Sequence, residues 1–61
     1  MSNFESGDLV GLLKATMGTR FLTGISGIII KPVSEKSSMW IVLIQGQPRE
    51  IHWELLVKIE L

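Results

Sequence analysis

The sequence predicts an all-β fold built from five short strands, and two observations support this. Short apolar runs recur along the chain between glycine, proline and polar residues, within positions 7–10, 27–30, 40–44 and 51–57, and β-branched residues are frequent in the second and third of them. β-Branched residues favour an extended backbone, and no segment between the runs shows the periodicity of a long helix. Because 61 residues leave room for one domain, we expect a single small five-stranded barrel.

The first half of the chain is the harder half to delimit. We expect strand one at residues 8–13. A helix over residues 8–17 stays open as the alternative, because apolar residues fall at helical spacing behind a potential N-cap, namely Leu9, Leu12, Leu13 and Met17 after Asp8. Residues 14–24 are rich in threonine and glycine, which predicts a long irregular loop between strands one and two, with a hairpin-like excursion at residues 17–20.

Strand two is expected at residues 25–33, where β-branched residues dominate. Gly24 and Gly27 predict a bulge or a sharp bend, as a small barrel needs where a strand turns a corner. Pro32 cannot donate to a strand ladder, so the end of this strand should lie at an edge or near a turn.

The second half of the chain is more regular. We expect a polar hairpin loop at 34–38, strand three at 39–45, a turn at 46–47, strand four at 49–52 and a 3₁₀ turn within 53–56. The final strand, 57–61, alternates so that Val57, Ile59 and Leu61 are expected to face inward and Lys58 and Glu60 to face water. Residues 1–6 are expected to form a flexible polar tail ahead of a barrel domain at 7–61.

Strand three is apolar on both faces, which a strand with one solvated face should not be. Met39, Ile41 and Leu43 form one face, and Trp40, Val42 and Ile44 form the other. We therefore expect the outward face to be covered by another subunit or a partner. The predicted interface candidates are Trp40, Val42, Ile44, Ile28, Ile30 and Trp53.

Composition agrees with self-association. The chain is 46% hydrophobic and has 6 glycines, which together make about 56% of its residues against roughly 45–50% for an average soluble domain. Its 6 basic and 6 acidic residues cancel, which removes charge repulsion between copies. No apolar run is long enough to span a membrane, and no signal peptide is visible, so a cytoplasmic location is expected.

Catalysis and cofactor binding are not expected. The chain has no cysteine and a single histidine, which excludes disulfides, thiolate zinc sites and a multi-histidine metal site within one chain. His52 beside Trp53 and Glu54 is the one candidate acid or base, but no nucleophile motif or phosphate-binding glycine loop accompanies it. We interpret His52 as a surface residue at a strand end and Asp8 as a residue that shapes a turn.

Nucleic-acid binding is the alternative function. The candidate contacts to phosphate are the scattered cations Lys14, Arg20, Lys31, Lys36 and Arg49. Zero net charge and interleaved glutamates argue against a basic binding stripe.

A resemblance to a known family adds to this interpretation. The order GDLV, GIII, WIVLIQGQ and IHWELLVKIEL, over residues 7–61, resembles small uncharacterised SH3-like barrel proteins common in tailed bacteriophages. Similar patterns occur in KOW and Tudor-like barrels. The resemblance implies an SH3-like barrel and a phage or bacterial origin, with the host cytoplasm as the location if the chain is phage-encoded, but it implies no activity.

Signalling SH3 domains carry tyrosines and a Pro-x-x-Tyr turn that bind polyproline. This chain has no tyrosine, and residues 51–55 occupy the place of that turn, so polyproline binding is not expected. The predicted function is a non-enzymatic interaction or assembly module that self-associates through an apolar outer face of strands two and three. The alternative is a KOW- or Tudor-like nucleic-acid-binding module.

Overall fold

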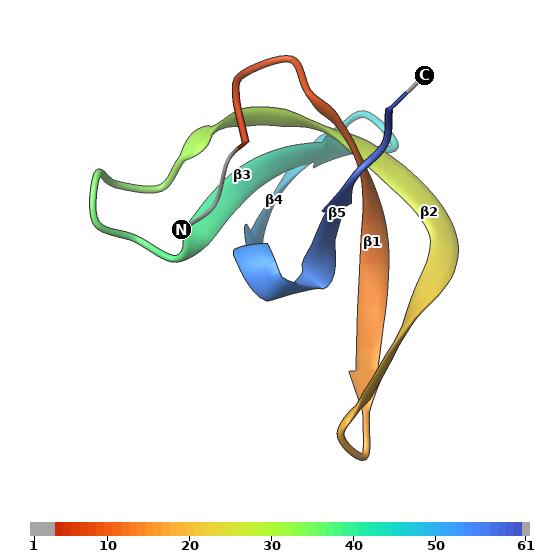
Figure 1. Ribbon diagram of the computed structural model, residues 1–61. Coiled ribbons are helices and arrows are strands. Elements are labelled where there is room, and N and C mark those ends of the chain that lie inside the picture. The colour runs from red at the N-terminus through yellow and green to blue at the C-terminus, as the bar shows by residue number, and fades with distance from the viewer. Residues whose placement is uncertain (1–3, 61) are drawn as a thin grey trace.

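The computed structural model describes residues 4–60 and contains five antiparallel strands in one sheet. The elements are β1 (Leu9–Thr16), β2 (Thr19–Pro32), β3 (Met39–Ile44), β4 (Gln47–His52), the 3₁₀ helix η1 (Trp53–Leu55) and β5 (Leu56–Lys58). The all-β prediction is confirmed, and the helical alternative for residues 8–17 is wrong. The strand order is β4-β3-β2-β1-β5. Within residues 4–60 no ladder joins β4 to β5, so the sheet is curved but not closed into a barrel (Figure 1).

The predicted long loop at residues 14–24 is wrong, because β1 and β2 continue as a hairpin to Thr16 and Thr19. Met17 and Gly18 connect them with φ of 52° and 79°, the positive pair of a type I′ turn, whose twist matches that of the paired strands. Gly18 adopts the positive φ that the turn requires, and the β-branched residues Thr16 and Thr19 pair on either side of the turn. Beyond Leu13 the two strands pair only with each other, and Figure 1 shows them projecting from the sheet as an arm.

The predicted bend in β2 is confirmed at Gly24, which has φ of 84°. The register of β1 against β2 shifts at this level, between Gly11 and Leu13. Thr23 stabilises the irregularity: its hydroxyl donates to the Leu12 carbonyl at 3.0 Å and accepts from the Ile25 N–H at 3.1 Å. Because of the bend, one end of β2 pairs with β1 in the arm and the other end pairs with β1 and β3 in the body of the sheet.

The β3–β4 hairpin is also tighter than the sequence predicts. Its two-residue turn is Gln45-Gly46, with φ of 52° and 80°, so β4 begins at Gln47 instead of residue 49. Pro48 is tolerated because β4 is an edge strand. β2 ends at Pro32, one residue before its expected end at 33, and the predicted 3₁₀ turn is present as η1.

The core lies on the inner side of the curved sheet. Its buried side chains come from four strands: Val10, Ile29, Trp40, Val42 and Leu56, with Phe4, Leu12, Ile44 and Ile51 packed against them. Of the predicted tail, residues 1–3 lie outside the described residues. Phe4 is half-buried and makes an edge-to-face contact with Trp40, with ring centroids 5.7 Å apart.

The predicted outward face of β3 is wrong. Trp40 and Val42 are 8% and 0% exposed, and Ile44 packs against them. The reason is the pairing of Val42 with Ile29, because paired residues share a face and Ile29 belongs to the core.

The predicted phase of the last strand is wrong by one residue for the same kind of reason. Leu56 is buried, whereas Val57 and Ile59 are 40% and 36% exposed; Leu61 lies outside the described residues. Lys58 lies beside Val10 in the ladder, and its Nζ is 3.5 Å from an oxygen of Asp8.

Candidate interaction surfaces

An apolar row crosses the outer side of the sheet. Leu9 pairs with Ile28, and Ile28 pairs with Leu43. The Ile59 N–H donates to the Leu9 carbonyl at 2.9 Å, which places Ile59 beside Leu9. Because directly opposed residues of antiparallel strands point to the same side, the row runs over β1, β2 and β3 and the residue that follows β5, on the side opposite the core.

Two further side chains widen this row around Gly11. Val57 pairs with Gly11, and a Cβ placed on Gly11 would lie 3.3 Å from Leu22 Cδ2 and 3.6 Å from Ile59 Cδ1. Leu22 and Ile59 therefore converge over the position where glycine has no side chain. We name the six apolar residues the outer face: Leu9, Leu22, Ile28, Leu43, Val57 and Ile59.

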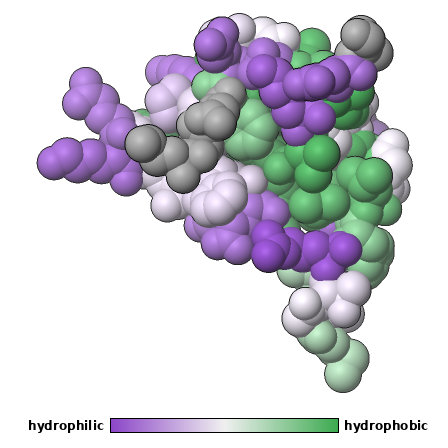
Figure 2. Space-filling view, viewed as in Figure 1, coloured by the Kyte–Doolittle hydropathy of each residue, from purple (hydrophilic) through white to green (hydrophobic). Residues whose placement is uncertain are grey.

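The outer face is open to solvent. Leu22 is 65% exposed, Ile28 is 44% and Leu43 is 37%. Figure 2 shows hydrophobic side chains gathered over β1, β5 and the adjoining part of β2. None of the six residues is charged, so this face can bind an apolar surface and offers no group for acid–base chemistry.

The outer face only partly coincides with the predicted interface. Of the predicted members, Ile28 lies on it, and Ile30 is half-buried beside a register shift in β2. Sequence reasoning missed Leu9, Leu22, Val57 and Ile59 as interface residues, and it placed Leu43 on the inward side of β3. Leu22 is missed because residues 14–24 are interpreted as a loop, which assigns no face of the sheet to them.

A second surface is an aromatic groove of about 380 Å³ beside η1. Trp40 and Trp53, predicted as contact residues, both line it; the remaining lining residues are Pro32, Glu35, Lys36, Ser37 and Ser38. Trp53 is 38% exposed and stacks on His52 with ring centroids 5.9 Å apart. The structure thus brings the two tryptophans to one site, with Trp40 mostly in the core and Trp53 at the surface.

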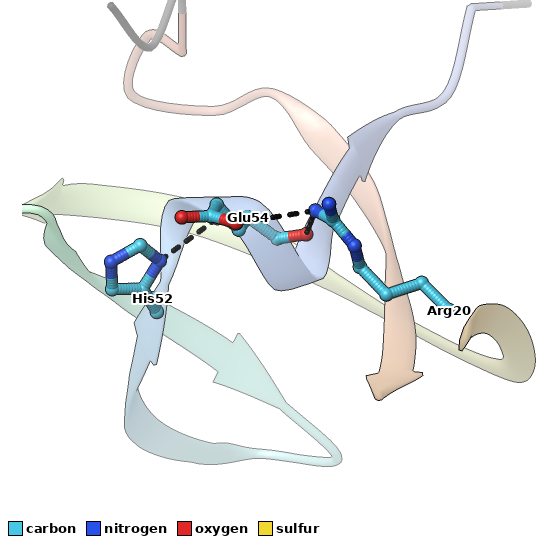
Figure 3. Close-up of polar contacts among 3 residues, drawn as sticks. All are labelled: Arg20, His52 and Glu54. Atoms are coloured by element: carbon cyan, nitrogen blue, oxygen red, sulfur yellow. Dashed lines mark hydrogen bonds and ion pairs between the residues drawn. The ribbon is translucent and has the colours of Figure 1, made fainter. Parts of the chain in front are cut away.

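His52 has a structural role in this geometry. Its Nδ1 accepts a hydrogen bond from the Glu54 N–H at 3.1 Å, which caps the first turn of η1 (Figure 3). Arg20 of the arm reaches the same turn: its Nη1 lies 3.4 Å from Glu54 Oε2 and donates to the Glu54 carbonyl at 3.2 Å. These contacts fasten η1 to the arm.

The predicted phosphate-binding cations are spread over several elements. Arg20 is engaged by Glu54, and Arg49 on β4 donates to Gln47 Oε1 at 3.2 Å. Lys36 lines the aromatic groove, while Lys14 is on the arm and Lys31 is near the end of β2. Asp8 accepts from the Glu5 N–H at 2.8 Å, so it shapes the local turn as the sequence predicts.

Neither a metal centre nor a membrane-spanning helix is found in the described part of the chain. Within residues 4–60 no three histidine, aspartate or glutamate side chains group closely enough to hold a metal ion. No helix in the same range is long and apolar enough to cross a bilayer. Comparisons of the chain with protein-family models, with curated proteins and with solved structures found no match.

Proposed function

We propose that the chain is a protein-interaction module whose open, curved sheet is related to the SH3-like folds, and that it docks its partner through the outer face. The observation that carries the proposal is the row Ile59–Leu9–Ile28–Leu43, which is apolar, contiguous and solvent-facing. Support for the SH3-like assignment comes from the antiparallel order of the strands, the 3₁₀ turn between β4 and β5, and the pairing of β5 with β1.

The size of the outer face favours an interaction site over incidental exposure. From the exposed fractions of its members we obtain on the order of 350 Å² of contiguous apolar surface, using areas typical of aliphatic side chains. The largest such patch on a typical monomer is about 300–600 Å² and is often functional.

A peptide-display selection tests the proposal. The folded domain is the bait for a random peptide library, and each recovered peptide is then tested against Ile28→Lys, on the outer face, and Met17→Lys, at the exposed tip of the arm. We expect the peptides to bind wild type and Met17→Lys alike and to lose binding to Ile28→Lys. Peptides that bind Ile28→Lys as tightly as wild type would contradict the proposal.

The alternative, a KOW- or Tudor-like nucleic-acid module, draws on the aromatic groove, where exposed Trp53 and Lys36 offer a stacking surface and a cation. The two kinds of binding differ in their dependence on salt concentration. Binding to phosphates weakens steeply as salt rises, whereas apolar association does not. Binding of a fluorescent single-stranded oligonucleotide at two salt concentrations tests the alternative. The absence of enzymatic activity, a phage origin and a cytoplasmic location stay predictions.

A further inference from the structure

We infer that the partner covering the outer face is a second copy of this chain, so that two sheets pack face to face about a two-fold axis. This inference rests on the proposed function of that face. A two-fold contact uses the same patch on both copies, and a row that crosses the sheet from β5 to β3 meets this requirement. The β5 end of one row packs against the β3 end of the other, and Leu9 and Ile28 lie near the axis.

The small hydrophobic core of the single chain favours stabilisation by a second copy. Only five hydrophobic side chains are buried among the described residues, and a domain of this size buries only about 60% of the surface that its unfolded chain exposes. Natural proteins of this size often gain stability from disulfides, a structural metal or oligomerisation. The chain has no cysteine, and residues 4–60 contain no group of metal ligands. Of these three sources of stability, oligomerisation is the one left. An identical copy is a partner that is available wherever the chain is made.

The apolar area of the outer face is sufficient for a dimer interface. Two outer faces in contact would bury on the order of 700 Å² of apolar surface, twice the patch estimated from the exposed fractions. Since about 60% of an interface is apolar, the whole contact would bury roughly 1,200 Å². This is the lower limit for specific, stable interfaces. An interface at this limit is typical of a weak, reversible dimer.

The charge of the chain also favours association with an identical copy. Formal net charge is zero, and none of the six residues of the outer face is charged, so no net charge repulsion opposes the approach of two copies. The charges beside Leu43 on the same side of the sheet are of opposite sign, since Lys31 and Glu50 both pair with Ile41. A strongly basic or acidic partner would find no complementary charge on the outer face, whereas an identical neutral face matches it.

Sedimentation velocity over a range of about 1 µM to 1 mM tests the inference. We expect wild type to shift from monomer to dimer across this range, with little dependence on salt. Ile28→Lys and Val57→Lys should each raise the dissociation constant at least about 100-fold, because a lysine would be buried without a partner charge. Met17→Lys is the matched control and should dimerise like wild type, since Met17 is 98% exposed on the arm and lies outside the outer face.

Folding of each variant is checked by circular dichroism. If a lysine variant fails to fold, Ile28→Thr replaces it, because threonine keeps the β-branch and still removes apolar contact. A wild-type monomer at every concentration would overturn the inference, and so would a dimer that both lysine variants preserve. The proposed function is read separately: displayed peptides that need Ile28 would sustain it even if the chain is monomeric.

Discussion

Replacing Gly27 by alanine tests how closely β2 approaches β3. A Cβ at this position would lie 2.7 Å from Val42 Cγ1 and 2.9 Å from both Ile44 Cγ1 and the Leu43 backbone oxygen. Distances below 3.0 Å do not occur between real Cβ atoms and their neighbours, so something must move. Val42 and Ile44 are held by the core, and the Leu43 oxygen belongs to the backbone of a paired strand.

The expected cost is large for a domain of this size. Overpacking a core costs about 1–3 kcal/mol, and we expect the upper half of this range because a backbone atom is among the three contacts. Alanine recovers about 0.5–1 kcal/mol of backbone entropy relative to glycine. The net loss of about 1–2.5 kcal/mol would lower the melting temperature by roughly 5–20 °C. A domain of 61 residues has in total only about 3–9 kcal/mol of stability.

Thermal and urea unfolding, followed by tryptophan fluorescence, measure this effect. The experiments use one low protein concentration, because dimerisation would make the measured stability depend on concentration. Gly11→Ala is the matched control: its Cβ would meet only side-chain atoms of Leu22 and Ile59, at 3.3 Å and beyond, and these can rotate. We expect this control to lie within about 0.5 kcal/mol of wild type. A Gly27→Ala variant as stable as wild type would refute the close approach of the two strands.

Two further predictions concern the tryptophans of the aromatic groove and the neighbouring His52. Trp40→Ala should cost about 3–5 kcal/mol and leave much of the protein unfolded, because it removes a core side chain and its contact with Phe4. Trp53→Ala should cost about 1 kcal/mol or less, because Trp53 is partly exposed; equal losses in urea unfolding would mean that the two roles are misassigned. His52→Ala should cost about 0.5–2 kcal/mol through loss of the cap on η1, and His52→Asn should restore most of it, since asparagine is a good N-cap. An Asn variant no more stable than the Ala variant would argue against capping.

Local signals in the sequence predicted much of the fold. Glycine at position 24 predicted the bend in β2, and Pro32 predicted the end of that strand, because both constrain the backbone wherever they stand. The arm was missed because threonine and glycine are frequent both in loops and in a tight hairpin. What separates these two possibilities is the cross-strand pairing of Leu13 with Leu22, which is not a local property.

The orientation of β3 could not be predicted from its own residues. Both of its faces are apolar, so the alternation that normally distinguishes inside from outside is missing. The orientation is set by the neighbours, since Val42 pairs with the buried Ile29. The outer face itself follows from this pairing, which is why Val57 and Ile59 were assigned to the core and Leu43 to the wrong side.

The most direct test of the account is an isotope-filtered nuclear Overhauser experiment on a mixture of ¹³C-labelled and unlabelled protein at high concentration. It detects only methyl groups that touch the other copy. We expect contacts between copies from the methyl groups of Ile28, Leu43, Val57 and Ile59, and none from the core methyl groups of Val10 and Val42. Contacts between copies that involve only residues outside the outer face, or no such contacts at all, would contradict the account.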